Sequence, residues 1–271
     1  MGSALVLLVA LLVVLLGVPL GLYLFQDRLL FHPQPLDEAQ RAQIVRQFPG
    51  VREAAVQAAD GTRLHAWHLP APGTARPLIL YFGGNAENVA WMIPEAAAHT
   101  PGTSWLFVDY RGYGGSEGAP SADAMAADAL AWHDYAVKTF QPGQVFVFGR
   151  SLGSGAAVRL ASERPLAGVI LVTPFDSLSA VAKHHYPFLP VELMLRHRFD
   201  SIDLAPKIVT PLLTIAAAQD RVVPPVHARR LHDAWAGPKH WVELSGADHN
   251  DTDVNPAFWR SILQFMSNPG M

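Results

Sequence analysis

Gly149-Arg150-Ser151-Leu152-Gly153 lies between an apolar strand pattern at residues 145–148 and an alanine-rich helical pattern at residues 154–163. A Gly-x-Ser-x-Gly sequence in a strand-to-helix turn presents the serine hydroxyl above a sheet, beside helix amides that favour negative charge. We expect both glycines to be required, because a β-carbon at either position would collide in so tight a turn. The stretch therefore predicts nucleophilic acyl chemistry at Ser151.

A second match to the same pattern, Gly114-Gly115-Ser116-Glu117-Gly118, has a different context. Residues 109–113 separate it from the preceding apolar run, and Pro120 follows before a helical pattern begins near residue 121. Glycine and proline at this density are typical of a loop. We therefore interpret Ser116 as a loop serine.

Length and composition exclude several classes of function. The chain has 271 residues, and the part beyond its N-terminal segment suits one large α/β domain. Its formal net charge is -3 and no basic tract occurs, which argues against a nucleic-acid partner. The absence of cysteine excludes a cysteine nucleophile and a cysteine zinc site. The histidines show no metal-binding spacing, so we expect neither a metal nor another cofactor.

The N-terminal segment has the composition of a membrane helix. Residues 4–25 carry no charge and are mostly Leu, Val and Ala, and about 20 such residues span a bilayer. A cleaved signal peptide would have a shorter apolar core, a basic start and a small-residue cleavage site. We therefore expect a single-pass anchor at residues 1–27 and a globular domain at residues 28–271, and the flanking charges do not indicate the side of the membrane.

The remainder of the chain alternates strand and helix patterns. A short helix is expected at residues 41–48, and a hairpin at residues 54–58 and 63–69 surrounds the turn dipeptide Asp60-Gly61. The further strands are expected at residues 78–82, 104–108, 144–148, 167–172, 211–216 and 240–244. Helices are expected at residues 89–99, 122–138, 154–163, 225–234 and 256–266. Near-continuous apolar strands with helical crossovers are typical of a mostly parallel sheet that is buried on both faces.

Residues 174–207 interrupt this alternation, and a long connection inside a compact domain usually carries function. We interpret the segment as a cap over the reactive serine. Apolar and aromatic side chains are frequent in it, and we expect Phe188, Leu189 and Met194 to bind substrate. The alternative is an extra pair of packed helices with no role in substrate binding.

An acid and a histidine follow two of the expected strands, namely Asp220 and His249. The carboxyl ends of parallel strands meet at one edge of a sheet, where ligands bind. The order Ser151, Asp220, His249 along the chain is a known order for serine hydrolases. In this arrangement the serine attacks, the histidine accepts its proton and the aspartate orients the imidazole. Asp176 is a rival acid because it follows the strand expected at residues 167–172.

Acyl transfer also needs main-chain amides that stabilise an oxyanion. We expect one from Leu152, which follows the nucleophile, and a second from Asn85 in the loop after the strand at residues 78–82. Gly83 and Gly84 would let this loop approach closely, and we expect Gly84 to contact the substrate.

These motifs together resemble the membrane-anchored α/β-hydrolases of the serine aminopeptidase-like group, which also includes eukaryotic protein depalmitoylating thioesterases. The matching stretches are residues 81–88, 109–118, 149–153, 220–224 and 246–251. The resemblance implies the α/β-hydrolase fold, with a mostly parallel sheet, helices on both faces, a small cap and a preceding transmembrane helix. It also implies the triad Ser151, Asp220 and His249. The chain departs from the group at Gly83, where a histidine that supports the oxyanion loop is usual.

The residues and the resemblance predict a membrane-anchored serine hydrolase that cleaves an ester or thioester with a hydrophobic acyl group. A serine peptidase is the alternative within enzymes, although no acidic site for a substrate's free amine is evident. A non-catalytic, membrane-tethered scaffold is the alternative from another class, and the complete set of three reactive residues argues against it. The sequence names neither the substrate nor the oligomeric state.

Overall fold

The computed structural model describes residues 2–270, and in the first helix it describes the side chains of residues 3, 5–8, 13 and 16–30. The described chain forms one eight-stranded sheet with the order β1-β2-β4-β3-β5-β6-β7-β8. β1 (Arg52–Gln57) and β2 (Arg63–Leu69) form an antiparallel hairpin, and β2 is also antiparallel to β4. All other neighbours are parallel. These strands are β3 (Leu78–Phe82), β4 (Ser104–Val108), β5 (Val145–Arg150), β6 (Gly168–Val172), β7 (Leu212–Ala217) and β8 (Lys239–Leu244).

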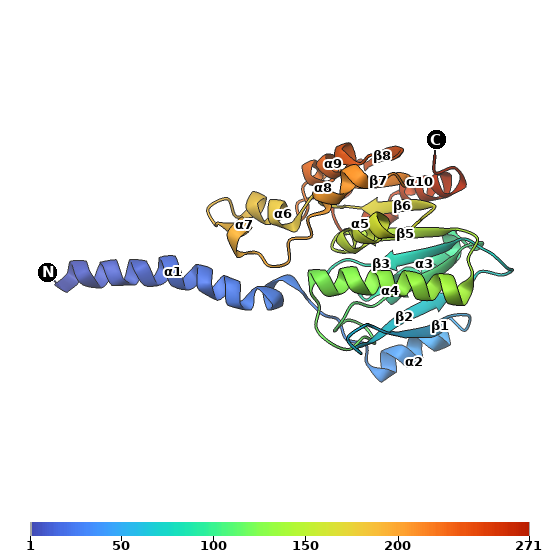
Figure 1. Cartoon of the computed structure of the whole chain (residues 1–271), viewed down its shortest axis with the longest axis horizontal. Helices are drawn as coiled ribbons and strands as arrows, with labels where there is room; N and C mark the ends of the chain where they lie inside the picture. The colour runs from blue at the N-terminus through green and yellow to red at the C-terminus, as the bar shows by residue number, and fades with distance from the viewer. Residues whose placement is uncertain (1, 271) are drawn as a thin grey trace.

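Helices cover both faces of the sheet (Figure 1), as its apolar strands require. Along β3, Leu80 points to one face and Tyr81 to the other, and both are fully buried. The first face is covered by α4 (Ala122–Phe140), α5 (Gly153–Glu163) and α9 (Pro225–Ala234). The second face is covered by α2 (Glu38–Gln47), η1 (Val89–Trp91), α3 (Met92–His99) and α10 (Pro256–Ser267). The predicted fold class, a mostly parallel α/β sheet with helices on both faces, is confirmed.

The expected elements agree with the structure to within about three residues at each end, with two informative differences. The helix expected at residues 41–48 begins earlier, at Glu38. Asp37 caps it by accepting from the amide of Gln40 at 2.7 Å, and the Gln40 side chain accepts from the amide of Asp37 at 3.1 Å. This reciprocal pair is a capping box. The helix expected at residues 89–99 begins instead as the 3₁₀ turn η1, which Asn88 caps.

The segment at residues 174–207, which we interpreted from the sequence as a cap and call the cap below, leaves the sheet after β6. It contains α6 (Leu178–His185), α7 (Val191–Met194), α8 (Ser201–Leu204) and η2 (Ala205–Lys207). Figure 1 shows α6 and α7 at the end of the molecule from which α1 (Gly2–Leu30) projects. An apolar groove lies between α1 and this part of the cap.

The transmembrane span expected at residues 4–25 lies within α1, partly on side chains outside the described set. Among the helices that the structure describes, none meets the length and apolarity needed to cross a membrane. α1 continues to Leu30, three residues beyond the expected end of the anchor.

Candidate active site

Ser151 occupies a strained turn between β5 and α5. Its φ of 49° lies in the left-handed region, which is unfavourable for residues other than glycine. Two hydrogen bonds hold this conformation: the Ser151 amide donates to the Val172 carbonyl at 2.9 Å, and the Ser154 hydroxyl donates to the Ser151 carbonyl at 2.7 Å. An added β-carbon at Gly149 would lie 2.7 Å from Cβ of Ala157.

At Gly153 an added β-carbon would overlap the main-chain carbonyl of Phe82 on the neighbouring strand. Both collisions predicted from the sequence are therefore present. The glycines allow α5 to begin directly beneath Ser151, with its main chain against β3.

Gly153→Ala is expected to destabilise the fold by about 3 kcal/mol or more, because main-chain atoms cannot move aside as a flexible side chain can. The midpoint of thermal unfolding should fall by roughly 10 °C in a chain of this size. Gly102→Ala is the matched control, since an added β-carbon there has no neighbour within 4 Å. Equal melting temperatures for the two variants would contradict the close packing described for the turn.

The structure brings Ser151, His249 and Asp220 together at the carboxyl edge of the sheet. Nε2 of His249 lies 2.9 Å from the Ser151 hydroxyl, and Nδ1 lies 2.7 Å from Oδ2 of Asp220. The other carboxylate oxygen of Asp220 accepts from the amides of Val222 and Val223 at 2.9 and 2.8 Å. His249 and Asp220 are both buried. A hydroxyl, an imidazole and a carboxylate are thus joined by hydrogen bonds, in the order that a nucleophile, its base and a group that orients the base would need.

Asp176 is bonded to a different histidine. Its Oδ1 lies 2.8 Å from Nδ1 of His227 and also accepts from the amide of Ser177 at 2.8 Å. Burial opposes ionisation of this carboxyl, but the hydrogen bonds from His227 and the Ser177 amide hold its pKa below the ordinary value. Asp176 therefore stabilises the packing of α9 against the start of the cap and makes no contact with His249.

Ser116 lies in the loop between β4 and α4, as interpreted from the sequence. Its hydroxyl donates to the Asp109 carbonyl at 2.8 Å and accepts from the His65 amide at 2.8 Å. The His65 imidazole pairs with the Asp109 carboxylate at 2.7 Å. No local pattern in the sequence indicates this second cluster of Ser, His and Asp. Its serine oxygen bonds to main-chain groups, so the imidazole is not placed to take its proton.

A hollow of about 600 Å³ opens beside Ser151. Its walls come from the segment after α1, the loop after β3, the turn after β5 and the loops after β7 and β8. The lining residues are His32, Gly84, Asn85, Ala86, Glu87, Asn88, Trp91, Arg150, Ser151, Val222, His249, Asn250 and Asp253. Gly84 is close to the nucleophile, since its added β-carbon would lie 3.7 Å from Cβ of Ser151.

Glu87 supports the loop after β3, and the sequence reasoning missed this role. One carboxylate oxygen accepts from the Gly84 amide at 2.6 Å and the other from the Tyr81 hydroxyl at 2.5 Å. Burial and the neighbouring Glu87 raise the pKa of Tyr81 well above its ordinary value, so the hydroxyl remains a donor. An added β-carbon at Gly83 would lie 2.8 Å from Glu87. The carboxylate thus occupies the space beside Gly83.

No residue of the segment 174–207 lines the hollow beside Ser151, so the cap residues predicted to bind substrate lie elsewhere, in two different environments. Leu189 and Met194 line the groove between α1 and the cap, which has a volume of about 380 Å³. Phe188 is 78% exposed and lies outside that groove. Leu22 and Leu30 of α1 form part of the opposite wall.

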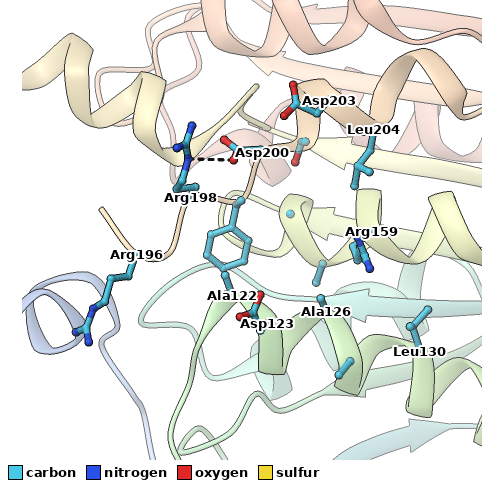
Figure 2. Close-up of a pocket in the computed structure, with 15 residues that line it drawn as sticks. Ala122, Asp123, Ala126, Leu130, Arg159, Arg196, Arg198, Asp200, Asp203 and Leu204 are labelled. Atoms are coloured by element: carbon cyan, nitrogen blue, oxygen red, sulfur yellow. Dashed lines mark ion pairs between the residues drawn. The ribbon is translucent and has the colours of Figure 1, made fainter. Parts of the chain in front are cut away.

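Another hollow of about 600 Å³ lies between α4, α5 and α8 (Figure 2). Charged side chains of both signs line it, including the ion pair between Arg198 and Asp200 at 3.0 Å. None of its lining residues belongs to the group around Ser151. We therefore place the candidate site at Ser151. Within the residues that the structure describes, no cluster of three or more acidic or histidine side chains is arranged to hold a metal ion.

Comparisons with known proteins agree with the fold. A family profile described as serine aminopeptidase, S33, matches residues 74–199. The α/β hydrolase domain-containing protein WAV2 of Arabidopsis thaliana is 30% identical over 241 residues, covering 78% of this chain and 77% of the plant protein. The chain belongs to the α/β-hydrolases.

Two further relatives of this α/β-hydrolase have no assigned function in their names. The uncharacterized protein Rv2307c of Mycobacterium tuberculosis is 36% identical over 244 residues, covering 88% of this chain and 85% of the relative. The uncharacterized membrane protein YNL320W of Saccharomyces cerevisiae is 29% identical over 221 residues and covers 78% of each chain. Among solved structures, the Pyrococcus furiosus esterase Pf2001 superposes with a TM-score of 0.68 at 18% identity, covering 89% of this chain and all of that one. That likeness shows the shared fold.

Proposed function

We propose that this α/β-hydrolase cleaves a carboxylic ester or thioester that has a hydrophobic acyl group, through a Ser-His-Asp triad. The hydrogen-bonded chain from Ser151 through His249 to Asp220 carries the proposal. It supplies a nucleophile, a general base and an orienting carboxylate in one buried group. A non-catalytic scaffold would have no need of this arrangement or of the strained turn at Ser151.

The reaction would proceed in two halves. Ser151 attacks the acyl carbonyl while Nε2 of His249 takes the hydroxyl proton, and Asp220 stabilises the imidazolium that forms. The main-chain amides of Leu152 and Asn85 would bind the oxyanion of the tetrahedral intermediate. His249 then protonates the leaving alcohol or thiol, which leaves an acyl group on Ser151. Water, activated by the same imidazole, releases the acid and restores the serine.

The groove between α1 and the cap supports a hydrophobic acyl group. Its walls are mostly apolar, and its volume lies within the range of small-molecule sites. Leu30 lines the groove, and its carbonyl accepts a 2.6 Å hydrogen bond from the side chain of Asn85, which lines the hollow at Ser151. We infer that an acyl chain attached to the reacting carbonyl would extend past Leu30 toward Leu189 and Met194.

We also propose that α1 attaches the domain to a membrane at residues 1–27, with residues 28–271 as the hydrolase domain. The apolar composition of residues 4–25 supports this, and Leu7 and Leu16 on α1 are 71% and 69% exposed. On the cap beside α1, Phe188 and Leu193 are 78% and 87% exposed. Apolar side chains at this exposure are typical of a surface that contacts lipid.

The proposed substrate class is tested with a series of acyl esters and matched thioesters and amides. Each buried CH₂ contributes about 0.8 kcal/mol, so kcat/KM should rise roughly fourfold per added carbon until the groove is full. Met194→Asp should abolish this rise and leave the acetyl ester largely unaffected. Leu263→Asp, at an exposed position on α10, is the matched control.

A maximum at the acetyl ester, with decline for every longer chain, would contradict an acyl groove. Faster cleavage of aminoacyl amides than of any ester would favour a serine peptidase instead. A folded protein that hydrolyses none of these substrates would favour the scaffold.

A further inference from the structure

The loop that would carry the second oxyanion amide is bonded to the end of α1. Nδ2 of Asn85 donates to the Leu30 carbonyl at 2.6 Å, and Oδ1 of Asn85 accepts from the His32 amide at 3.0 Å. Oδ1 also accepts from the hydroxyl of Tyr113 at 2.7 Å. The next residue, Ala86, has a φ of 58°, so the loop holds an unfavourable conformation that needs such support.

Tyr113 fixes both partners of this contact. It is 2% exposed, and its oxygen also accepts from the His32 amide at 3.0 Å. Burial raises the pKa of Tyr113 to about 12, so its hydroxyl stays protonated and donates to Asn85 at ordinary pH. The chain leaving α1 is held a second time at Gly114, whose carbonyl accepts from the Leu36 amide at 2.9 Å and whose amide donates to the Gln34 carbonyl at 2.8 Å.

The same end of α1 is bonded to the cap. The Gln26 side chain is buried, donates to the Met194 carbonyl at 3.1 Å and accepts from the Arg196 amide at 2.7 Å. Asp27 pairs with Arg196 at 2.8 Å and with His197 at 2.7 Å. A buried amide side chain that satisfies two main-chain groups holds them in one relative position.

We propose that residues 26–32, the last turn of α1 and the two residues after it, are a positioning element of the active site. Through Asn85 it sets the position of the oxyanion loop, and through Gln26 it sets the position of the cap wall of the acyl groove. This inference rests on the proposed hydrolase function. It makes the end of the N-terminal helix part of the substrate-processing machinery.

The two contacts predict different kinetic effects. Asn85→Ala and Tyr113→Phe should lower kcat on an acetyl ester about tenfold with little change in KM, because losing an oxyanion donor outright costs about 10²–10³ and a displaced donor costs less. Gln26→Ala should raise KM for a long-chain ester severalfold and raise KM for the acetyl ester much less. Tyr135→Phe is the matched control, at a half-buried tyrosine of α4 that packs against Trp132 and Phe140.

Each kcat is expressed per active site, counted by titration of Ser151 with a fluorophosphonate, so that loss of folded protein does not count as loss of turnover. The inference would be overturned, with the proposed function intact, if Asn85→Ala and Tyr113→Phe had the same kcat per site as the wild type and Tyr135→Phe. Parallel changes of kcat and KM in all three variants would also overturn it. A wild-type protein that neither hydrolyses esters nor is labelled at Ser151 would overturn the proposed function, and this inference with it.

Discussion

Ser151→Ala is expected to reduce ester hydrolysis to background, whereas Ser116→Ala should leave it largely intact. Removing the nucleophile of a serine triad lowers turnover by a factor on the order of 10⁶, because no other group in the site can form the acyl-enzyme. The Ser151 oxygen is the one that contacts an imidazole, at 2.9 Å. Ser116→Ala would lose two hydrogen bonds to main-chain groups, which contribute about 1 kcal/mol each to stability.

The measurement compares turnover of both variants with their melting temperatures. Ser151→Ala should retain the fold, and Ser116→Ala should melt somewhat earlier at nearly full activity. Mass spectrometry of the wild type after fluorophosphonate treatment identifies the labelled residue independently. An adduct on Ser116 would assign the nucleophile to the other Gly-x-Ser-x-Gly sequence and overturn the proposed triad.

Asp220→Asn should lower kcat by a factor on the order of 10⁴, with the fold retained. Asparagine preserves the shape of the side chain, but it removes the charge that stabilises the imidazolium and favours the wrong tautomer of His249. Asp176→Asn should change kcat far less, because that carboxyl bonds to His227.

Asp176→Asn should instead change the response of stability to acid. The folded-state pKa of Asp176 is below its ordinary value, so its contribution is present above the unfolded pKa of about 4 and is lost as pH falls further. Acid unfolding of the variant should therefore depend less on pH in that window. If Asp176→Asn proved more harmful to kcat than Asp220→Asn, the assignment of the acid would have to be reversed.

The site was predictable where its signals are local. The turn at Ser151 is recognisable because a strand pattern, two glycines and a helix pattern follow one another without a gap. Asp220 and His249 were found because parallel strands place their carboxyl ends at one edge, whatever the order of the strands. Asp37 also carried a local signal, the Asp-x-x-Gln of a capping box. The helix start expected at residue 41 did not take this signal into account.

Contacts between distant segments were not predictable in this way. Asp220 and Asp176 both follow strands, and only their packing shows which of them meets His249. No local pattern distinguishes Glu87 from other acids in loops. Its role depends on the fold, which places it against Gly84 and the buried hydroxyl of Tyr81.

The sequence by itself determined the α/β class and the strand-to-helix turn at Ser151, because hydrophobic periodicity and glycine placement act over a few residues. The tertiary structure decided which acid reaches His249, which residues surround the groove, and that the end of α1 bonds to both Asn85 and the cap. Such contacts join residues up to about 170 positions apart, as between Gln26 and Arg196. They depend on how whole elements pack against one sheet, and the local pattern around each residue does not encode that packing.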